Sequence, residues 1–155
     1  MKKVLFVCHG NICRSPMAEM IFKYMVNLKN LQDEFFVDSA GTSDEESRYH
    51  SPIHKGTKNV LKKNKIPFTE HIAKQFTVND YKNFDYIICM EQYNIDNLLR
   101  IVGKDKDKKI YRLFDFGNNP KDVDDPWYHH NFDKTFDEIY EGCEQLLKYL
   151  LKSDQ

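Results

Sequence analysis

The sequence lacks most of the features that mark fibrous, disordered or nucleic-acid-binding chains. Its 155 residues include 6 glycines and 5 prolines, too few for a collagenous or low-complexity protein. Lysine and arginine number 23 against 24 aspartates and glutamates, so the net charge of −1 supplies no basic field for a polyanion. With 41% hydrophobic residues, the chain is expected to fold as one globular domain that does not bind nucleic acid.

The amino-terminal residues lack a long hydrophobic run. Met1, Lys2 and Lys3 precede the apolar segment Val4–Val7, which is too short for the core of a signal peptide or for a membrane span. We therefore expect a cytoplasmic protein without membrane contact, although the sequence leaves export by an unconventional route open. Its oligomeric state is open as well, and we expect a monomer or a weak homodimer.

The four cysteines lack the paired spacing of a zinc site, and in a reducing compartment they are expected to be free thiols. Cys89 lies in an apolar run and Cys143 on a predicted helix face, a placement typical of buried small hydrophobes. Four histidines form no convincing set of metal ligands: His50, His54, His129 and His130. We expect neither a metal nor a cofactor.

Hydrophobic patterning predicts strands that alternate with helices. Continuous apolar runs predict buried strands at residues 3–7, 35–37, 86–90 and 110–116. Apolar residues at helical spacing predict helices at 16–28, 54–65, from 77 onward, 95–102 and 136–150. Segments 42–50 and 117–131 are predicted loops. This alternation predicts an open parallel sheet with helices on both faces.

The segment after the first strand combines a thiol with several features that suit a bound phosphate. Cys8 ends the strand, and Arg14 follows after five residues. Ser15 is expected to cap a helix that begins at Pro16. The helix N-terminus and the guanidinium fork of Arg14 would both attract phosphate oxygens. The same positive potential would stabilise a thiolate at Cys8, which makes Cys8 a candidate nucleophile.

The residues between the thiol and the helix can curl around an anion. Gly10 and Asn11 tolerate the left-handed backbone that such a curl requires. Backbone N–H groups would then point inward as a nest. The predicted phosphate-binding loop consists of His9, Gly10, Asn11, Ile12, Cys13, Arg14 and Ser15. It is not a nucleotide-binding loop, because it contains no lysine.

A carboxylate follows the fourth predicted strand. In open parallel sheets the carboxyl ends of the strands share one edge, where ligands bind. Cys8 and Asp125 leave their strands at this edge, so we expect them to meet there. Asp124 is the neighbouring carboxylate with which Asp125 is most easily confused.

Four motifs together resemble the low molecular weight protein tyrosine phosphatases. They are VCHGNICRSP at 7–16, DSAGT at 38–42, HIAKQ at 71–75 and DPWY at 125–128, and the resemblance covers essentially the whole chain in order. The first motif is highly specific, whereas the others are strong only jointly. The resemblance implies one phosphatase domain over 1–155, a flavodoxin-like α/β fold with a four-stranded parallel sheet in the order 2-1-3-4.

The resemblance also implies a reaction and roles for three residues. Cys8 would attack a phosphotyrosine or other aryl phosphomonoester and form a cysteinyl-phosphate. Arg14 would bind the phosphate, and Asp125 would serve as general acid and then as general base. Phosphotyrosine-containing proteins or peptides would be the substrates and inorganic phosphate a product.

Further residues would support the loop or the substrate. Asn11 and His71 resemble a pair that braces the loop, and Ser15 would donate its hydroxyl to the thiolate. In the family, aromatic residues at the positions of Trp127 and Tyr128 form a wall for the phosphotyrosine ring; packing of this pair into the core is the alternative.

This sequence departs from the family at the expected substrate cleft. The loop after the second strand offers Glu45, Glu46 and Tyr49 but no tryptophan, and we expect Glu46 and Tyr49 to line the cleft. Lys74 stands where many members have arginine. The preference for peptide sequence is therefore open.

Two thiols in one loop suggest redox chemistry. Cys13 is close enough to Cys8 in a curled loop to form a reversible disulfide under peroxide, which would protect the nucleophile.

Three other functions stay open. An arsenate reductase of this fold relays a disulfide through two further cysteines, and only Cys89 lies in the corresponding region. A protein arginine phosphatase typically carries threonine where this chain has the bulkier Ile12. A non-catalytic phosphate-binding or redox-sensing module is the third alternative, although its dithiol spacing exceeds that of Cys-x-x-Cys proteins.

Overall fold

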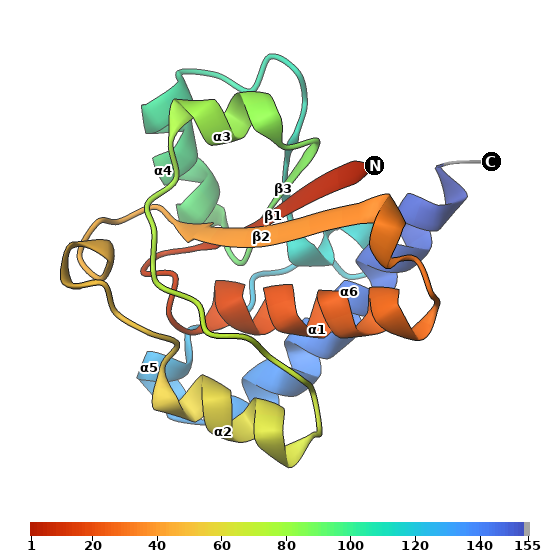
Figure 1. The fold of residues 1–155 in the computed structure, drawn as a ribbon. Helices are drawn as coiled ribbons and strands as arrows, with labels where there is room; N and C mark the ends of the chain where they lie inside the picture. Colours follow the sequence, from red (N-terminus) through yellow and green to blue (C-terminus); the bar gives the residue numbers. More distant parts are fainter. Residues whose placement is uncertain (154–155) are drawn as a thin grey trace.

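A computed structural model describes residues 1–153 and contains a four-stranded parallel sheet (Figure 1). The strands are β1 (Lys2–Cys8), β2 (Phe35–Gly41), β3 (Tyr86–Cys89) and β4 (Ile110–Arg112). Their order is β2-β1-β3-β4, which confirms the predicted fold. The last two residues of the predicted domain, 154–155, lie outside the described part of the chain.

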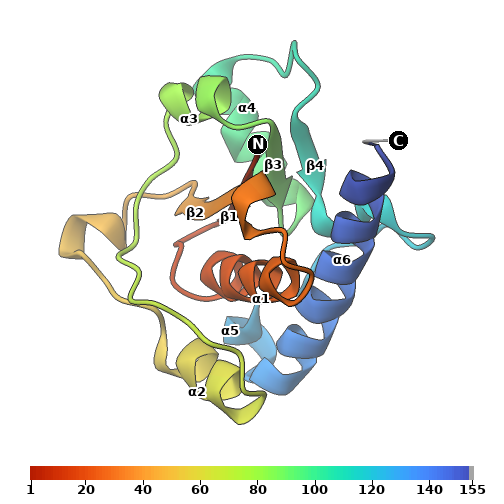
Figure 2. The same ribbon diagram turned by 45° about the vertical axis from the view of Figure 1, so that its right-hand side comes forward.

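Helices cover both faces of the sheet (Figures 1 and 2). The faces are covered by α1 and α6 on one side and by α3 and α4 on the other, and α2 packs against α6. The helices are α1 (Arg14–Leu28), α2 (Lys55–Lys63), α3 (Val78–Asn83), α4 (Gln92–Val102), α5 (Pro126–His129) and α6 (Phe132–Lys152), and the short 3-10 turns are η1 (Gln32–Glu34), η2 (Ser47–Tyr49) and η3 (Leu113–Phe116).

The central strand explains the continuous apolar run near the amino terminus. Val4 and Phe6 belong to the core beneath α1 and α6, whereas Leu5 and Val7 belong to the core beneath α3 and α4. All four side chains are fully buried, because β1 is covered on both faces. The strand therefore carries Cys8 rigidly to the carboxyl edge of the sheet.

The fourth strand is shorter than predicted. It ends at Arg112, because the Asp115 carboxylate accepts a 2.7 Å hydrogen bond from the Arg112 backbone N–H and turns the chain into η3. Leu113 and Phe114 are both buried in this turn, which packs against α6. Two consecutive buried residues occur both in a turn that is covered on one side and in a strand that is covered on both faces. The apolar run therefore did not distinguish a longer strand from a strand followed by a turn.

Other boundaries also differ from the prediction, and two of these differences bear on the segments around Cys8 and Asp125. The first helix begins at Arg14 rather than Pro16, and Ser15 does not cap it, because its hydroxyl faces Cys8 instead. The short helix α5 lies within the predicted loop 117–131, where the Asp125 carboxylate caps it by accepting from Trp127 N–H at 3.0 Å. Among residues 1–153, none of the helices has both the length and the apolar character that crossing a bilayer requires.

Candidate active site

The loop between β1 and α1 curls tightly because its neighbours hold its backbone. The carbonyls of Cys8 and His9 each accept a 3.0 Å hydrogen bond from the segment that follows β2, and Ile12 accepts one of 2.8 Å from His54 N–H. Asn11 adopts the predicted left-handed backbone with φ 62°. Gly41 must be glycine here, since an added Cβ would lie 2.7 Å from the His9 carbonyl oxygen.

Gly10 differs from the prediction, because its backbone is not left-handed. An added Cβ at Gly10 would instead lie 3.3 Å from Cγ of Glu46. The absence of a side chain at Gly10 therefore leaves space for Glu46 beside the loop. The left-handed residue that makes the sharp turn is Asn11.

Cys8 lies in a small pocket at the carboxyl edge of the sheet. Its Sγ is 2.9 Å from Ser15 Oγ and accepts a 3.3 Å hydrogen bond from the backbone N–H of Asn11. The side chain is only 3% exposed. The pocket has a volume of about 180 Å³ and is lined by Cys8, His9, Gly10, Ile12, Cys13, Arg14, Glu45, Glu46, Asp125 and Trp127. The surrounding donors can stabilise a negative charge on sulfur or on a bound oxyanion.

Arg14 supplies a buried positive charge to this pocket. It is 2% exposed, and Nη1 donates to the Val123 carbonyl at 2.7 Å while Nη2 donates to Glu91 Oε1 at 3.0 Å. Burial alone would lower its pKa, but the negative groups at Cys8, Glu91 and Asp125 outweigh burial and raise the pKa of the guanidinium. The fork is thus charged and fixed in orientation.

Asp125 and its neighbour have different surroundings. The half-buried Asp125 places Oδ2 3.4 Å from Arg14 Nη2, and its other oxygen caps α5. Asp124 is exposed and pairs with Lys134 at 3.6 Å. The structure therefore brings Asp125, not Asp124, to Cys8 and Arg14.

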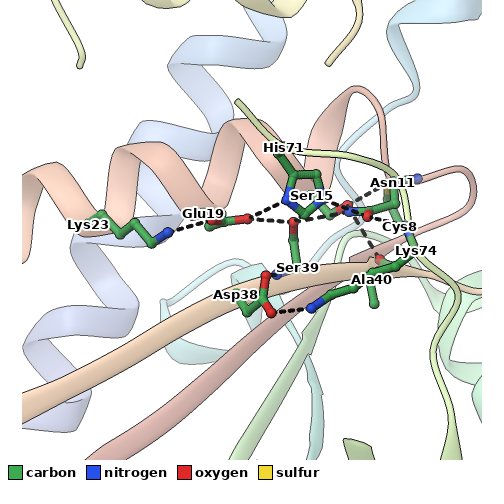
Figure 3. A network of polar contacts seen from close by, with 10 residues as sticks. All are labelled: Cys8, Asn11, Ser15, Glu19, Lys23, Asp38, Ser39, Ala40, His71 and Lys74. Atoms are coloured by element: carbon green, nitrogen blue, oxygen red, sulfur yellow. Dashed lines mark hydrogen bonds and ion pairs between the residues drawn. The ribbon is translucent and has the colours of Figure 1, made fainter. Parts of the chain in front are cut away.

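A buried polar network lies behind the loop (Figure 3). Asn11 Nδ2 donates to Ser15 Oγ at 2.9 Å and to Ser39 Oγ at 3.0 Å. Asn11 Oδ1 lies 2.8 Å from His71 Nε2 and accepts from the backbone N–H of Lys74 at 3.0 Å. Each polar group of the Asn11 side chain thus has a partner, so the network fixes the strained residue of the loop.

Glu19 and Ser39 complete this network and were missed in the sequence. Ser39 Oγ donates to Glu19 Oε1 at 2.7 Å, and Lys23 Nζ contacts Glu19 Oε2 at 2.6 Å. His71 Nδ1 lies 3.6 Å from Glu19 Oε1. Burial lowers the pKa of His71, and the carboxylates of Glu19 and Asp38 act in the opposite direction. Glu19 lies in the second turn of α1, so no local motif pointed to it.

Part of this network has the residue types of a metal site. Among the described residues 1–153, it is the one group of three or more histidine, cysteine or acidic side chains whose potential ligand atoms lie close together. Atoms of Glu19, Asp38 and His71 lie within 4.8 Å of one another. Their partners already satisfy them, because Glu19 pairs with Lys23 and Asp38 with Lys74. We interpret the group as support for the loop.

The rim of the pocket is more exposed than its floor. Trp127 and Glu46 line the pocket, and Trp127 is 56% exposed. Tyr49 and Tyr128 are 79% and 88% exposed and are not among the lining residues. The alternative that the aromatic pair packs into the core is therefore wrong. Lys74 pairs with Asp38 beside the network rather than lining the pocket.

The four cysteines, all within the described residues, are free and buried. Burial, followed by the charges at Cys8 and Asp125, raises the pKa of Cys13 to about 12. Burial also raises the pKa of Cys89 and Cys143, which lie in the core as predicted. Cys13, Cys89 and Cys143 are thus thiols at neutral pH, and Cys8 alone has Arg14, Ser15 and a backbone N–H beside its sulfur.

A larger groove of about 670 Å³ lies between α1 and α6. Its lining includes apolar residues such as Met25, Leu28 and Leu147, and none of the predicted site residues. Its lining has no cysteine and no arginine, so the smaller pocket, which has both Cys8 and Arg14, is the candidate active site.

Sequence comparisons match the full chain. A family model for "Low molecular weight phosphotyrosine protein phosphatase" matches residues 3–155. The chain is 41% identical to the low molecular weight protein-tyrosine-phosphatase YfkJ of Bacillus subtilis, over 100% of this chain and 99% of that protein. It is 39% identical to the low molecular weight protein-tyrosine-phosphatase PtpA of Staphylococcus aureus, over 98% of this chain and 96% of that protein.

Solved structures show the same fold. The crystal structure of YfkJ from Bacillus subtilis superposes with a TM-score of 0.94, covering 100% of this chain and 98% of that one at 41% identity. A Drosophila arginine phosphatase superposes with a TM-score of 0.84, covering 97% of this chain and 98% of that one at 31% identity. The fold is therefore shared by proteins named for two different phosphatase activities.

Proposed function

Because this chain belongs to the low molecular weight protein tyrosine phosphatase family and is a phosphatase, we propose that it hydrolyses aryl phosphomonoesters through a covalent bond to Cys8. The observation that carries this proposal is the convergence of Cys8, Arg14 and Asp125 in one pocket. A nucleophile, a fixed cation and a carboxylate are the groups that two successive displacements at phosphorus require.

In the first step, the Cys8 thiolate attacks phosphorus, and a sulfur–phosphorus bond forms as the bond to the aryl oxygen breaks. Arg14 and the inward N–H groups of the loop bind the non-bridging oxygens, whose charge they balance without a metal. Asp125 gives its proton to the leaving phenolate oxygen. The aryl ring lies against Trp127 at the rim.

In the second step, the Asp125 carboxylate takes a proton from water, and the water oxygen attacks phosphorus. The sulfur–phosphorus bond breaks, inorganic phosphate leaves, and Cys8 returns to the thiolate. Ser15, whose Oγ is 2.9 Å from Cys8 Sγ, donates its hydroxyl to this leaving sulfur. The Asp125 carboxyl group thus donates a proton in the first step and accepts one in the second.

Turnover of p-nitrophenyl phosphate at mildly acidic pH, with a chelator present, tests the proposal. Cys8→Ser should abolish turnover, and Asp125→Ala should slow it. Cys143→Ser changes a buried thiol remote from the pocket and serves as the control. Turnover that survives Cys8→Ser would overturn the assignment.

Arginine phosphatase activity is the nearest alternative, since a protein so named shares the fold. Ile12 lines the pocket, and its bulky apolar side chain favours an uncharged aryl ring over a charged phosphoguanidinium. Matched peptides that carry phosphotyrosine or phosphoarginine separate the two activities. Preferential hydrolysis of phosphoarginine would replace the aryl assignment.

An arsenate reductase is disfavoured by the same site. Beyond the two loop thiols, the chain offers only Cys89 and Cys143, and both are fully buried. Neither can relay a disulfide from Cys8 without a large rearrangement. Arsenate-dependent oxidation of a thiol reductant would contradict this conclusion.

Phosphotyrosine-containing proteins are the proposed substrates, acted on in the cytoplasm by a monomer or weak homodimer that uses residues 1–155 as one domain. Asp125→Ala should hold such proteins long enough for capture, because loss of the acid slows the first step. Capture that free phosphotyrosine does not displace would contradict the proposal.

We also propose that Cys13 protects Cys8 during oxidation. Peroxide oxidises the Cys8 thiolate to a sulfenic acid and releases hydroxide, and the Cys13 thiolate then attacks that sulfur and expels a second hydroxide. Cys8 and Cys13 both line the same pocket. With its pKa near 12, Cys13 gains thiolate about tenfold for each pH unit, so disulfide formation should accelerate as pH rises.

Mass spectrometry of the peroxide-treated protein checks this chemistry, with Cys13→Ser as the control. A Cys8–Cys13 crosslink is expected. Sulfinic or sulfonic acid at Cys8 without the crosslink would remove the proposal.

A further inference from the structure

The aromatic wall of the pocket rests on a histidine outside the pocket lining. Trp127 lies in the first turn of α5, and its ring meets the His54 ring edge-to-face, with centroids 5.3 Å apart and planes at 71°. Figures 1 and 2 both show α5 beside the beginning of α2, which His54 precedes. The His54 ring therefore packs against one side of an indole that is 56% exposed.

His54 is itself held from three directions. Its ring stacks on Phe132, with centroids 5.3 Å apart and planes at 9°. Its Nδ1 accepts a 2.9 Å hydrogen bond from Gly56 N–H and so caps α2. Its backbone N–H donates to the Ile12 carbonyl of the phosphate loop at 2.8 Å. The residue thus connects the loop that binds phosphate to the wall beside it.

Phe132, on which the His54 ring stacks, is tightly packed against Gly56. An added Cβ on Gly56 would lie 2.5 Å from the Phe132 ring, so Phe132 is pressed against the first turn of α2. This fixes the plane of His54, which in turn limits where the Trp127 ring can lie.

We propose that His54 is a positioning residue that sets the Trp127 wall and thereby determines selectivity for aryl over alkyl phosphates. The inference rests on the proposed phosphatase function. Asp125 has its own anchor in Arg14 at 3.4 Å, so loss of the His54 ring disturbs the wall more than the acid. A short alkyl phosphate has no ring to rest on the wall and does not depend on His54.

Three substitutions separate the ring from the helix cap. His54→Phe keeps a ring and removes the acceptor, His54→Leu removes both, and His54→Asn keeps an acceptor and removes the ring. For p-nitrophenyl phosphate, His54→Leu and His54→Asn should raise KM by about 3- to 10-fold, the fold-change of an edge-to-face aromatic contact. KM for phosphoserine and kcat for both substrates should change by less than about 2-fold, and His54→Phe should stay near wild type.

The fluorescence of Trp127 tests the placement without relying on activity, because the chain contains one tryptophan. Its steady-state anisotropy should fall in His54→Leu and His54→Asn and stay high in His54→Phe. His50→Asn is the control, since His50 is exposed and its left-handed backbone suits asparagine.

Two results would overturn the proposal. One is anisotropy that is the same in His54→Phe and His54→Leu, both of which lack the cap. The other is an equal loss for aryl and alkyl substrates, which would indicate a role in folding alone. If the fluorescence arm behaves as expected but Cys8→Ser remains active, the proposed chemistry fails and the placement of Trp127 stands.

Discussion

The floor and the rim of the pocket differ in how firmly the fold holds them. On the floor, the single side chain of Asn11 contacts Ser15, Ser39 and His71. Asn11, Ser15 and Ser39 are almost fully buried. On the rim, Tyr49 and Tyr128 project into solvent. Rigid groups can be preorganised for chemistry, whereas exposed loop residues can vary without cost to the fold. We therefore propose that the floor fixes the reaction and that the rim selects among substrates.

The comparison is sharpest at the two adjacent aspartates. Asp125→Asn should lower kcat for phenyl phosphate by about 10²- to 10⁴-fold, because the leaving oxygen loses its proton donor. The loss should be smaller for p-nitrophenyl phosphate, whose leaving group needs less assistance. Asp124→Asn is the matched control and should remain near wild type, and equal losses in the two variants would contradict the assignment.

Arg14→Lys probes whether the floor needs a fork or only a charge. Lysine keeps the positive charge but cannot present two parallel donors, and it cannot satisfy Val123 and Glu91 together. We expect kcat/KM to fall by about 10²- to 10³-fold in steady-state assays. The exposed Arg100→Lys should have no effect. Wild-type kinetics in Arg14→Lys would mean that the fork is not used.

Ser39→Ala tests the network behind the loop. The buried hydroxyl bonds both Glu19 and Asn11, so its removal should lower the free energy of unfolding by about 1–3 kcal/mol in urea titrations. Activity should fall less than in Asp125→Asn. Ser47→Ala loses only a local bond to the Asp44 carbonyl and should be nearly neutral. A Ser39→Ala protein as stable as wild type would show that the network does not support the loop.

The smallest effect is expected at the rim. Tyr49→Ala should change the free energy of unfolding by no more than about 0.5 kcal/mol, because the side chain is exposed. Turnover of p-nitrophenyl phosphate should stay within about 2-fold of wild type. A change in ranking among phosphotyrosine peptides would identify Tyr49 as a contact for flanking residues. A loss as large as that of Arg14→Lys would erase the distinction between floor and rim.

The sequence predicted the parts of the site that follow from local patterning. The apolar run before Cys8 marked a buried strand, and the edge rule for parallel sheets placed Asp125 opposite it. The same rule could have found Glu91, which lies two residues beyond the end of the third strand and binds Arg14.

Other features depended on long-range packing and had no local signal. Ser15 resembles a helix cap, yet its hydroxyl turns toward Cys8 once the loop is closed. Glu19 and Ser39 are separated by twenty positions and meet only because α1 packs against β2. The strand β4 ends at Arg112 because of a hydrogen bond to Asp115. The apolar residues around Asp115 had predicted that the strand continues through it. Buried polar pairs of this kind cannot be derived from periodicity alone.

The central claim is that Cys8 carries the phosphoryl group during turnover. Rapid quenching of Asp125→Ala during turnover of p-nitrophenyl phosphate, which ejects its phenolate without an acid, followed by peptide mass spectrometry, tests it most directly. We expect one phosphoryl group on the peptide that contains Cys8 and none when Cys8 is serine. A phosphoryl group on another residue, or turnover with no phosphoryl group on Cys8 at any time, would contradict the account.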